Sequence, residues 1–367
     1  MDAVQRRGAG EALVDGGAPD LPGANRESDF VSLALRLGGA LAALIALLAI
    51  SGAAYQWARS ASDLRRFPPP GEFVDVGGFR LHLVCQGEGE PTVVMDAGLG
   101  DSYLTWQGIQ PLAAKTTRVC AYDRAGLGYS DPGPEPRDSR RIVAELHELL
   151  GRAHLAAPYI LVGHSFGGFN TRLFAYTYPG EVAALVLVDV AHEDQYRLFP
   201  GSVRSGMEHF TRDLCSQSGR APFGIERMRG ITAADTMAAA PAQRLLATTL
   251  GYRTVWYRAV CDELLAFATA SSDEVRATRR PLAVPVYILD GSAHFAQELE
   301  ASGVPPHDAD SAAAVWHALH RELLTTPPLA RLIVAERSSH YVQFDQPDLV
   351  LEVIAQAVTA ARNRTEH

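Results

Sequence analysis

From residue 72 onward, short apolar runs alternate with longer segments that have helical periodicity. The segment 139–155 is amphipathic, because its apolar side chains recur at three- and four-residue spacing along one face. The short runs are apolar throughout, which is typical of parallel strands buried on both faces of a sheet. The pattern predicts strands at 72–76, 79–85, 91–96, 117–122, 158–162, 182–190, 284–289 and 331–334, with helices between them and a last helix at 347–362.

The alternation stops between residues 192 and 280. This part contains no apolar run of strand type, and its periodic segments indicate helices at 206–214, 233–249 and 254–270. We therefore expect a core formed by residues 72–191 and 281–367, and a helical cap at 192–280 that lies over the carboxyl edge of the sheet.

The N-terminal region follows a different pattern. Residues 1–36 are rich in Gly, Ala and charge without periodicity, which is typical of a disordered tail. Residues 37–57 are 21 uncharged residues, enough at about 1.5 Å per residue to cross a bilayer about 30 Å thick. We expect a single transmembrane helix there, with the lipid bilayer as its partner, and a linker at 58–71. The alternative is a signal peptide cleaved within residues 51–54.

Charge bears on the partners of the chain and on its orientation. The formal net charge is −9, so we expect no binding to nucleic acid. Arg59, Arg65 and Arg66 follow the apolar run, whereas Arg26 and Arg36 precede it, and the positive-inside rule then favours a cytoplasmic C-terminal domain by a small margin. The four cysteines have no metal-ligand spacing, and no motif indicates a cofactor.

The strongest chemical motif is Gly163-His164-Ser165-Phe166-Gly167. It follows a predicted strand and precedes a helical pattern, as expected of a nucleophile elbow, the sharp turn that lifts a serine hydroxyl clear of a sheet. Gly163 and Gly167 fit this interpretation, because side chains at these positions would collide with the turn. A serine hydroxyl is a weak nucleophile near neutral pH, so Ser165 needs a general base.

Together with three further motifs, the elbow resembles the lid-bearing α/β-hydrolases. The other motifs are Asp123-Arg124-x-Gly126-x-Gly128-x-Ser130, the Ala97-Gly98 turn and Ser339-His340. The resemblance covers residues 72–362 and is to prolyl iminopeptidases, haloalkane dehalogenases, esterases and membrane-anchored bacterial hydrolases. It implies a mostly parallel eight-stranded sheet with helices on both faces.

The resemblance also implies roles for a base and an acid. The family's base lies between the last strand and the last helix, where this chain has His340. The acid usually follows the seventh strand, but the loop 292–295 has no carboxylate, although Asp290 ends that strand. A variant within the family places it after the sixth strand, which ends here at Asp189. We expect Asp189 to be the acid, with Asp290 as the alternative and Asp194 as a further candidate.

Twelve histidines compete for the role of base. His164 lies inside the elbow and is expected to point into the sheet. His82 lies in an early strand, and His317 and His320 lie on a helix, so we expect structural roles for them.

The resemblance further implies an oxyanion hole and a type of reaction. The two N–H donors should be those of Phe166 and of Leu99, in the turn after the third strand. Relatives that act on haloalkanes or epoxides carry aspartate at the elbow, so Ser165 favours acyl transfer, with cleavage of an ester or amide bond in a small apolar substrate. We expect the cap aromatic residues Trp256, Tyr252 and Phe267 either to line its pocket or to form cap core.

Two other functions remain open. The chain could be a slow or non-catalytic homologue that binds a small molecule, since a fold does not establish an activity. It could also be an aminopeptidase similar to the prolyl iminopeptidases, which would need a negatively charged patch for the substrate amine. The cap supplies carboxylates at Glu208, Asp213, Glu226, Asp262 and Glu263, although these are also typical of a solvated surface.

The cysteines could pair. In this fold the second and fourth strands are neighbours, which could bring Cys85 close to Cys120, and Cys215 and Cys261 both lie in the cap. Two disulfides would favour an extracytoplasmic catalytic domain, whereas the arginines that flank the apolar run favour a cytoplasmic one. Four buried thiols in a cytoplasmic enzyme are the alternative.

Overall fold

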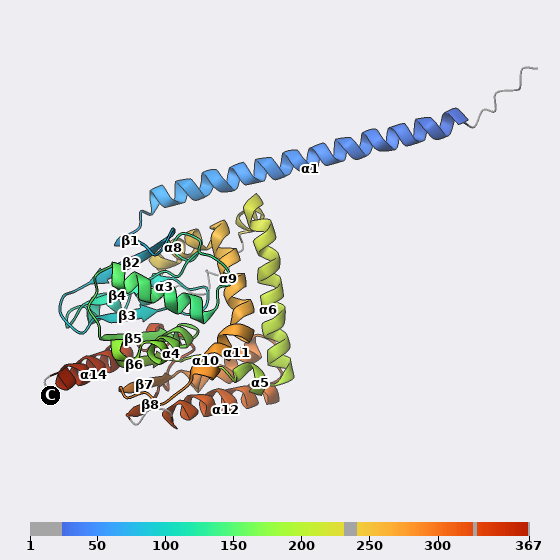
Figure 1. The fold of residues 1–367 in the computed structure, drawn as a ribbon. Helices are drawn as coiled ribbons and strands as arrows, with labels where there is room; N and C mark the ends of the chain where they lie inside the picture. The colour runs from blue at the N-terminus through green and yellow to red at the C-terminus, as the bar shows by residue number, and fades with distance from the viewer. Residues whose placement is uncertain (1–23, 231–240, 326–328, 366–367) are drawn as a thin grey trace, which may run out of the picture. The chain divides into compact units, whose positions relative to one another are not determined.

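The computed structural model describes residues 24–230, 241–325 and 329–365, and the chain divides into two compact units, residues 1–51 and 52–367. Eight strands form one sheet, in the order β1-β2-β4-β3-β5-β6-β7-β8 (Figure 1). The strands are β1 (Glu72–Asp75), β2 (Arg80–Gln86), β3 (Val93–Asp96), β4 (Val119–Tyr122), β5 (Tyr159–His164), β6 (Val182–Val188), β7 (Val286–Asp290) and β8 (Ala330–Val334).

The sheet is parallel except at one edge. The β1–β2 and β2–β4 pairs are antiparallel, and every other neighbouring pair is parallel. Each of the eight predicted strands is present within a few residues of its expected bounds. The prediction of a mostly parallel eight-stranded α/β-hydrolase sheet is therefore confirmed.

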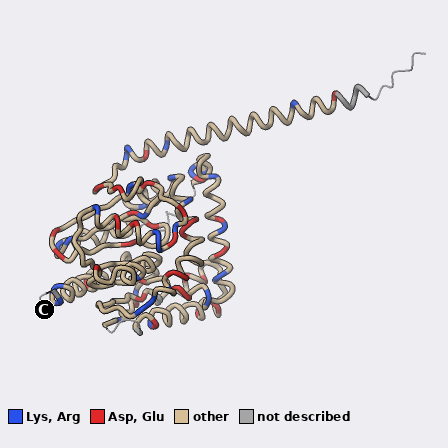
Figure 2. The backbone as a smooth tube through the Cα atoms, in the orientation of Figure 1, with Lys and Arg blue, Asp and Glu red and all other residues tan. Residues whose placement is uncertain are grey.

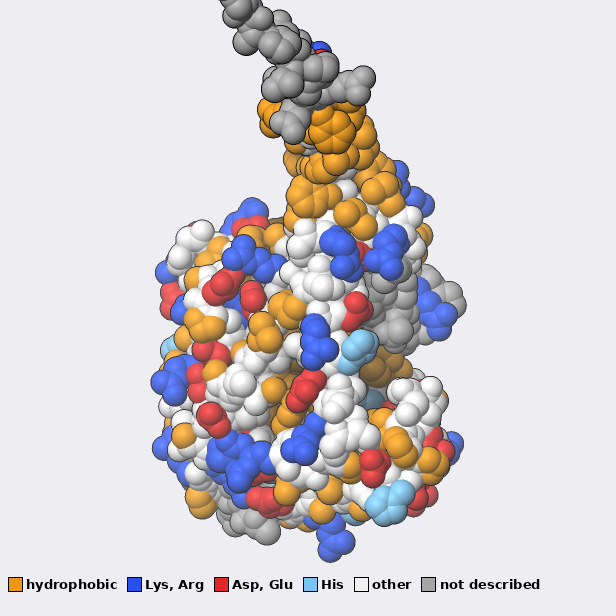
Figure 3. All heavy atoms as spheres, turned by 90° about the vertical axis from the view of Figure 1, so that its right-hand side faces the viewer, with side chains coloured by type: hydrophobic (Ala, Val, Ile, Leu, Met, Phe, Trp, Pro, Cys, Tyr) orange, Lys and Arg blue, Asp and Glu red, His pale blue; other side chains and the backbone are white. Residues whose placement is uncertain are grey.

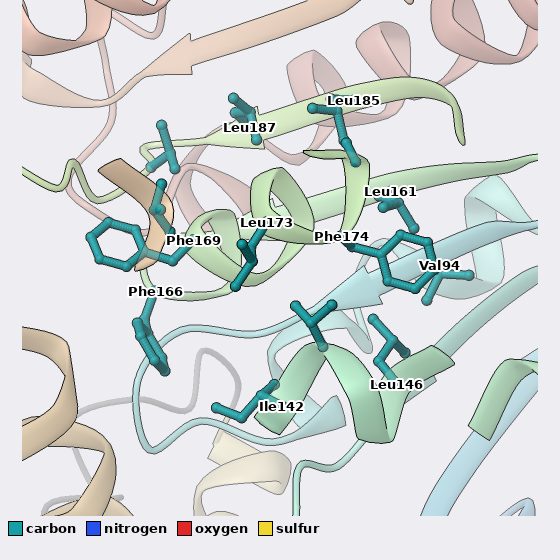
Figure 4. Close-up of a cluster of buried hydrophobic side chains, with 14 of the residues drawn as sticks. Val94, Ile142, Leu146, Leu161, Phe166, Phe169, Leu173, Phe174, Leu185 and Leu187 are labelled. Carbon is teal, nitrogen blue, oxygen red and sulfur yellow. The ribbon is translucent and has the colours of Figure 1, made fainter. Parts of the chain in front are cut away.

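Helices cover both faces of the sheet, because its central strands are buried on both sides. On one face, α3 (Ser139–Arg152) and α4 (Gly167–Thr177) pack against the strands, and Figure 4 shows Ile142 and Leu146 of α3 beside Phe169, Leu173 and Phe174 of α4. On the other face, α2 (Gln110–Ala113) and α14 (Pro347–Thr365) contribute to a second apolar cluster. The remaining helices after the cap are α11 (Phe295–Ala301), α12 (Pro306–Glu322) and α13 (Val342–Asp345).

Between β6 and β7 the described residues are helical or irregular. The helices are α5 (Gln195–Leu198), α6 (Gly201–Arg220), α7 (Ile225–Arg229), α8 (Pro241–Gly251), α9 (Thr254–Ala266) and α10 (Ser272–Thr278). The predicted 206–214 helix is longer than expected, and residues 233–240 of the predicted 233–249 helix lie outside the described residues. The predicted helix at 254–270 ends as regular α-helix at Ala266 and continues as a π-helical turn, Phe267–Ser271.

Both predicted cysteine pairs are disulfides. Cys85 and Cys120 are directly opposed on β2 and β4, with Cα atoms 4.0 Å apart. Cys215 and Cys261 join α6 to α9 within the cap. Apolar residues of these two helices, including Leu214, pack together around this second bridge.

The N-terminal helix is longer than expected. α1 runs from Ala24 to Arg66, so its helical structure includes residues 24–36, expected to be a tail, and 58–66, expected to be a linker. The backbone hydrogen bonds of a helix continue through polar residues that favour helix, and the apolar run alone does not mark its ends. Figure 2 shows its middle, residues 37–58, without charge. By length and composition the segment Asp29–Arg66 could cross a membrane.

The last turns of α1 contact the cap. Arg227 of α7 donates a hydrogen bond to Asp63 at 2.6 Å, and its guanidinium lies 4.8 Å from the ring centre of Tyr252. The Gln56 amide donates to the backbone oxygen of Tyr252 at 2.6 Å.

The face drawn in Figure 3 mixes acidic and basic side chains with apolar ones.

Candidate active site

Ser165 lies in the sharp turn between β5 and α4. Its φ angle is +49°, one of three positive values among the described non-glycine residues. Such a backbone is strained and persists only when its surroundings fix it. Here the N–H of Ser165 donates to Val188 O at 3.1 Å, and its oxygen accepts from the N–H of Ala191 at 3.1 Å and of Gly168 at 2.9 Å.

The two glycines of the elbow are required by space. A Cβ on Gly163 would lie 2.5 Å from Thr171 Oγ1, and one on Gly167 would press on the backbone oxygen of Asp96. Both contacts are much shorter than real Cβ contacts, as the motif predicts. The turn therefore packs directly against the end of β3.

His340 and Asp189 come together at the carboxyl edge of the sheet. His340 follows β8, and its Nδ1 lies 2.6 Å from Asp189 Oδ2. Asp189 directly follows β6 and also has a positive φ, +38°. Its other oxygen, Oδ1, accepts hydrogen bonds from the Gly291 N–H at 2.8 Å and from Trp316 Nε1 at 3.1 Å. The carboxylate is thus held on both oxygens.

This contact shifts both pKa values. Burial by itself would lower the pKa of His340, but the hydrogen bond and negative charge of Asp189 raise it above the usual histidine value. Burial by itself would raise the pKa of Asp189, but His340 above all, with His320 and Trp316, lowers it. The pair therefore favours an ionised Asp189 that stabilises an imidazolium at His340.

Asp290 is placed differently. It is fully buried at the end of β7, its Oδ1 lies 3.0 Å from His320 Nδ1, and its Oδ2 pairs with His317. His320 Nε2 donates to Val190 O at 2.9 Å. Among the described residues, no hydrogen bond joins Asp290 to His340. Asp290 thus forms a second histidine–carboxylate group with His317 and His320, distinct from the Asp189–His340 pair.

One atom each of Asp189, Asp290 and His320 lies within 4.8 Å of the others, a spacing that could hold a metal ion. Burial would lower the pKa of His320, but Asp290 and Asp189 raise it. His320 Nδ1 lies 3.0 Å from Asp290 Oδ1 and 3.9 Å from Asp189 Oδ1, so this one ring is close to both carboxylates.

His164 was predicted to point into the sheet, and this is wrong. Its Nε2 donates to the backbone oxygen of His340 at 2.9 Å, and the two rings are 4.7 Å apart. Burial lowers the pKa of His164 to about 3, so the ring is neutral. His164 therefore supports the loop that carries His340, a contact across 176 positions of sequence that no local pattern signals.

The expected oxyanion donors lie in two turns that end β3 and β5. Among the hydrogen bonds of the described turns and loops, none has the N–H of Phe166 or of Leu99 as its donor. The hydroxyl of Ser165 likewise makes no hydrogen bond to a described residue. Catalytic hydrogen bonds are often long in a free enzyme and tighten only when substrate binds.

The cap residues singled out from the sequence have other partners. Trp256 is buried and donates from Nε1 to Gly100 O at 2.9 Å, and Phe267 packs against Phe166 with ring centres 5.6 Å apart. Two of the five acidic cap residues are buried in ion pairs, Glu263 with Arg124 and Glu226 with Arg220. These carboxylates are occupied, which weakens the case for a site that binds a substrate amine.

A cavity of about 850 Å³ opens between α9 and the turn after β4. It is lined by Gly126, Pro134, Arg258 and Asp262, among others, and by none of the candidate catalytic residues. It is therefore separate from the elbow.

Comparison with known proteins agrees with this architecture. The family model described as alpha/beta hydrolase fold matches residues 91–238. Over 158 residues the chain is 28% identical to the uncharacterized protein YbdG of Bacillus subtilis. The aligned region covers 42% of this chain and 49% of YbdG. The match thus spans about half of that relative.

Two solved structures have a similar fold. The epoxide hydrolase CorEH superposes with a TM-score of 0.59 at 18% identity, over 78% of this chain and 96% of that one. The enol-lactonase from Burkholderia xenovorans LB400 superposes with a TM-score of 0.53 at 18% identity, over 78% of this chain and all of that one (100%).

Proposed function

Since the chain belongs to the α/β-hydrolase superfamily, we propose that it is a membrane-anchored serine hydrolase that cleaves a carboxylic ester through an acyl-enzyme. Ser165 is the nucleophile, His340 the base, and Asp189 the acid. Phe166 and Leu99 donate to the oxyanion. The substrate is a small molecule with an apolar acyl group.

One observation carries the proposal. Ser165 and Asp189 both have a positive φ, and the second of them lies 2.6 Å from His340 Nδ1. Strained backbone at a strand end costs about 1–3 kcal/mol per residue and clusters at functional sites. Ser165 and Asp189 directly follow the neighbouring strands β5 and β6, and Asp189 binds the histidine that would act as base, which supports nucleophilic catalysis at this edge of the sheet.

The residues support the following chemistry. His340 Nε2 takes the proton of Ser165 Oγ as the oxygen attacks the ester carbonyl, and the N–H groups of Phe166 and Leu99 stabilise the oxyanion. The tetrahedral intermediate collapses, and the alkoxide leaves with the proton from His340. Water then attacks the acyl-enzyme, with His340 again as base. This step releases the carboxylic acid product and restores the hydroxyl of Ser165. Asp189 holds the imidazole in the required tautomer throughout.

Ser165 separates this proposal from epoxide hydrolysis. CorEH is named as an epoxide hydrolase and the Burkholderia xenovorans protein as an enol-lactonase. A serine hydroxyl forms an acyl ester that water can hydrolyse, whereas attack of a hydroxyl on an epoxide would leave a stable ether. The elbow residue of this chain therefore favours a carbonyl substrate.

The membrane location rests on α1, whose segment Asp29–Arg66 is long and apolar enough to span a bilayer. The disulfides Cys85–Cys120 and Cys215–Cys261 favour a catalytic domain on the oxidising side of that membrane.

The test is labelling of the full chain in detergent with a fluorophosphonate probe, followed by hydrolysis of short and long p-nitrophenyl esters. We expect labelling and turnover in the wild type, and loss of both in Ser165→Ala. Ser311→Ala is the control, since the Ser311 hydroxyl makes an exposed hydrogen bond within α12, to the backbone oxygen of His307 at 2.8 Å. A folded wild type that is neither labelled nor active would instead support a non-catalytic binding protein.

A further inference from the structure

We propose that the cap helix α9 positions the oxyanion donor Leu99, and that Glu263 and Arg124 are the positioning residues. This inference rests on the proposed hydrolase function. It assigns to the cap a part in transition-state stabilisation, in addition to any part in covering the substrate.

Arg124 lies at the centre of the arrangement and is almost completely buried, with 2% of its side chain exposed. Its guanidinium has five N–H bonds, and all five are used. Nε and Nη2 donate to the two oxygens of Glu263 at 2.7 and 2.9 Å, and Nη1 donates to Asp96 Oδ1 at 2.7 Å. The remaining two N–H bonds go to backbone oxygens in the turn after β3, residues 97–100, which we call the oxyanion turn. These are the oxygens of Ala97 at 2.7 Å and Gly98 at 2.6 Å.

The bond to Gly98 O fixes the direction of the Leu99 N–H. These two groups belong to one peptide unit, which is planar and trans, so its oxygen and hydrogen point in opposite directions. Because Arg124 and the N–H of Asp101 both bind Gly98 O, the Leu99 N–H must point away from them. Arg124 therefore aims the donor without touching it.

α9 holds the next peptide of the turn directly. Glu263 Oε2 accepts from the Gly100 N–H at 3.2 Å, and Trp256 Nε1 donates to Gly100 O at 2.9 Å. Gly100 has φ +73°, and a Cβ there would lie 3.1 Å from Val260 Cγ2. Trp256, Val260 and Glu263 lie on one face of α9 in successive turns, and all three contact Gly100.

Arg124 also contacts the side chain of Phe166, the residue that carries the second expected donor. Its guanidinium carbon lies 5.5 Å from the ring centre of Phe166, whose N–H is the other expected donor. Buried charges cost several kcal/mol to desolvate, so a salt bridge in this position is not needed for stability alone. What this one provides is a fixed geometry for two turns that come from different strands and one cap helix.

The test is steady-state kinetics of the full chain with a p-nitrophenyl ester, together with inhibition by an arylboronic acid, which forms a tetrahedral adduct on serine. In Glu263→Gln we expect kcat to fall about 10- to 100-fold with little change in KM, by comparison with the loss of a whole oxyanion donor. The boronic acid should lose affinity by a similar factor, because its adduct uses the same donors.

Glu274→Gln is the matched control. Glu274 also joins the cap to the core, since its side chain accepts from the Arg140 N–H at 2.8 Å, but it lies outside the oxyanion turn. We expect its kcat and its boronic acid affinity to stay within about twofold of the wild type. Equal losses in Glu274→Gln and Glu263→Gln would overturn the proposal, because any cap-to-core contact would then have the same effect.

A second variant covers the case in which Glu263→Gln fails to fold. Arg124→Met combined with Glu263→Leu and Asp96→Asn removes Arg124 together with both of its carboxylate partners, so no buried charge is left without its counter-ion. We expect this variant to fold, to react with fluorophosphonate slowly, and to show the same loss of kcat and boronic acid affinity. Wild-type kcat and boronic acid affinity in a folded triple variant would overturn the proposal, whereas an inactive wild type would overturn the hydrolase function itself.

Discussion

Exchange of Asp189 for Asn should nearly abolish activity, whereas the same exchange at Asp290 should not. Both carboxylates are buried at the ends of neighbouring strands, and they have different partners. Asp189 pairs with His340, and Asp290 pairs with His317 and His320. The two variants are therefore matched in chemistry, burial and place in the sheet.

The structure sets the size of the effect. In Asp189→Asn, the amide oxygen can still accept from the Gly291 N–H and Trp316, at the positions now 2.8 and 3.1 Å away. The amide nitrogen then faces His340 Nδ1 and donates to it, which moves the imidazole proton to Nε2. A protonated Nε2 cannot take the proton of Ser165. A wrong tautomer costs about 10⁴-fold in kcat, or about 5 kcal/mol.

For Asp290→Asn the expected loss is less than about tenfold. Asp290 influences the site through its partner His320, which helps to lower the pKa of Asp189. The assay is kcat/KM for p-nitrophenyl acetate at pH 8, with urea unfolding to show that both variants are folded. A loss near 10⁴-fold in Asp290→Asn, with Asp189→Asn close to the wild type, would refute the assignment of the acid.

Three further predictions concern pH and packing. Because Asp189 raises the pKa of His340, kcat/KM should rise with pH through a midpoint above the usual histidine value of about 6.5, and a midpoint below 6 in the pH–rate profile would contradict this. Burial raises the pKa of Asp101 to about 7, so ionisation of this carboxyl should destabilise the fold as pH rises from about 4 to 7. Asp101→Asn should then raise the urea midpoint of unfolding at pH 8 and change it less at pH 4.5. Equal changes at both pH values would show that the ionisation of Asp101 is not the cause. Gly167→Ala should lower the free energy of unfolding by about 1–3 kcal/mol and abolish fluorophosphonate labelling, since its Cβ would press on Asp96 O. An unchanged thermal unfolding temperature together with unchanged labelling would disprove the close packing of the elbow.

The strands were predictable from the sequence because each is a continuous apolar run, and such runs have few other uses in a soluble domain. The elbow was predictable because its glycines are fixed by local space. The ends of α1 were not, since polar residues that continue a helix resemble those of a tail or a linker.

The acid could only be narrowed to alternatives from the sequence. Asp189 and Asp290 both end strands, and nothing local shows which carboxylate faces His340. The contact of His164 with the His340 loop and the pairing of Asp290 with His317 are of the same kind. Each joins residues that are distant in sequence, and each depends on side-chain directions at the edge of the assembled sheet.

The end of α1 also determines where the chain can be cut. Gln56 and Asp63 bind Tyr252 and Arg227 of the cap before the chain reaches β1. A fragment that begins after Phe67 loses both contacts and leaves Arg227 without the carboxylate of Asp63. A fragment that begins at Gly52 keeps them. The last turns of this helix thus belong to the compact unit of residues 52–367, and a fragment designed to keep the cap contacts should include them.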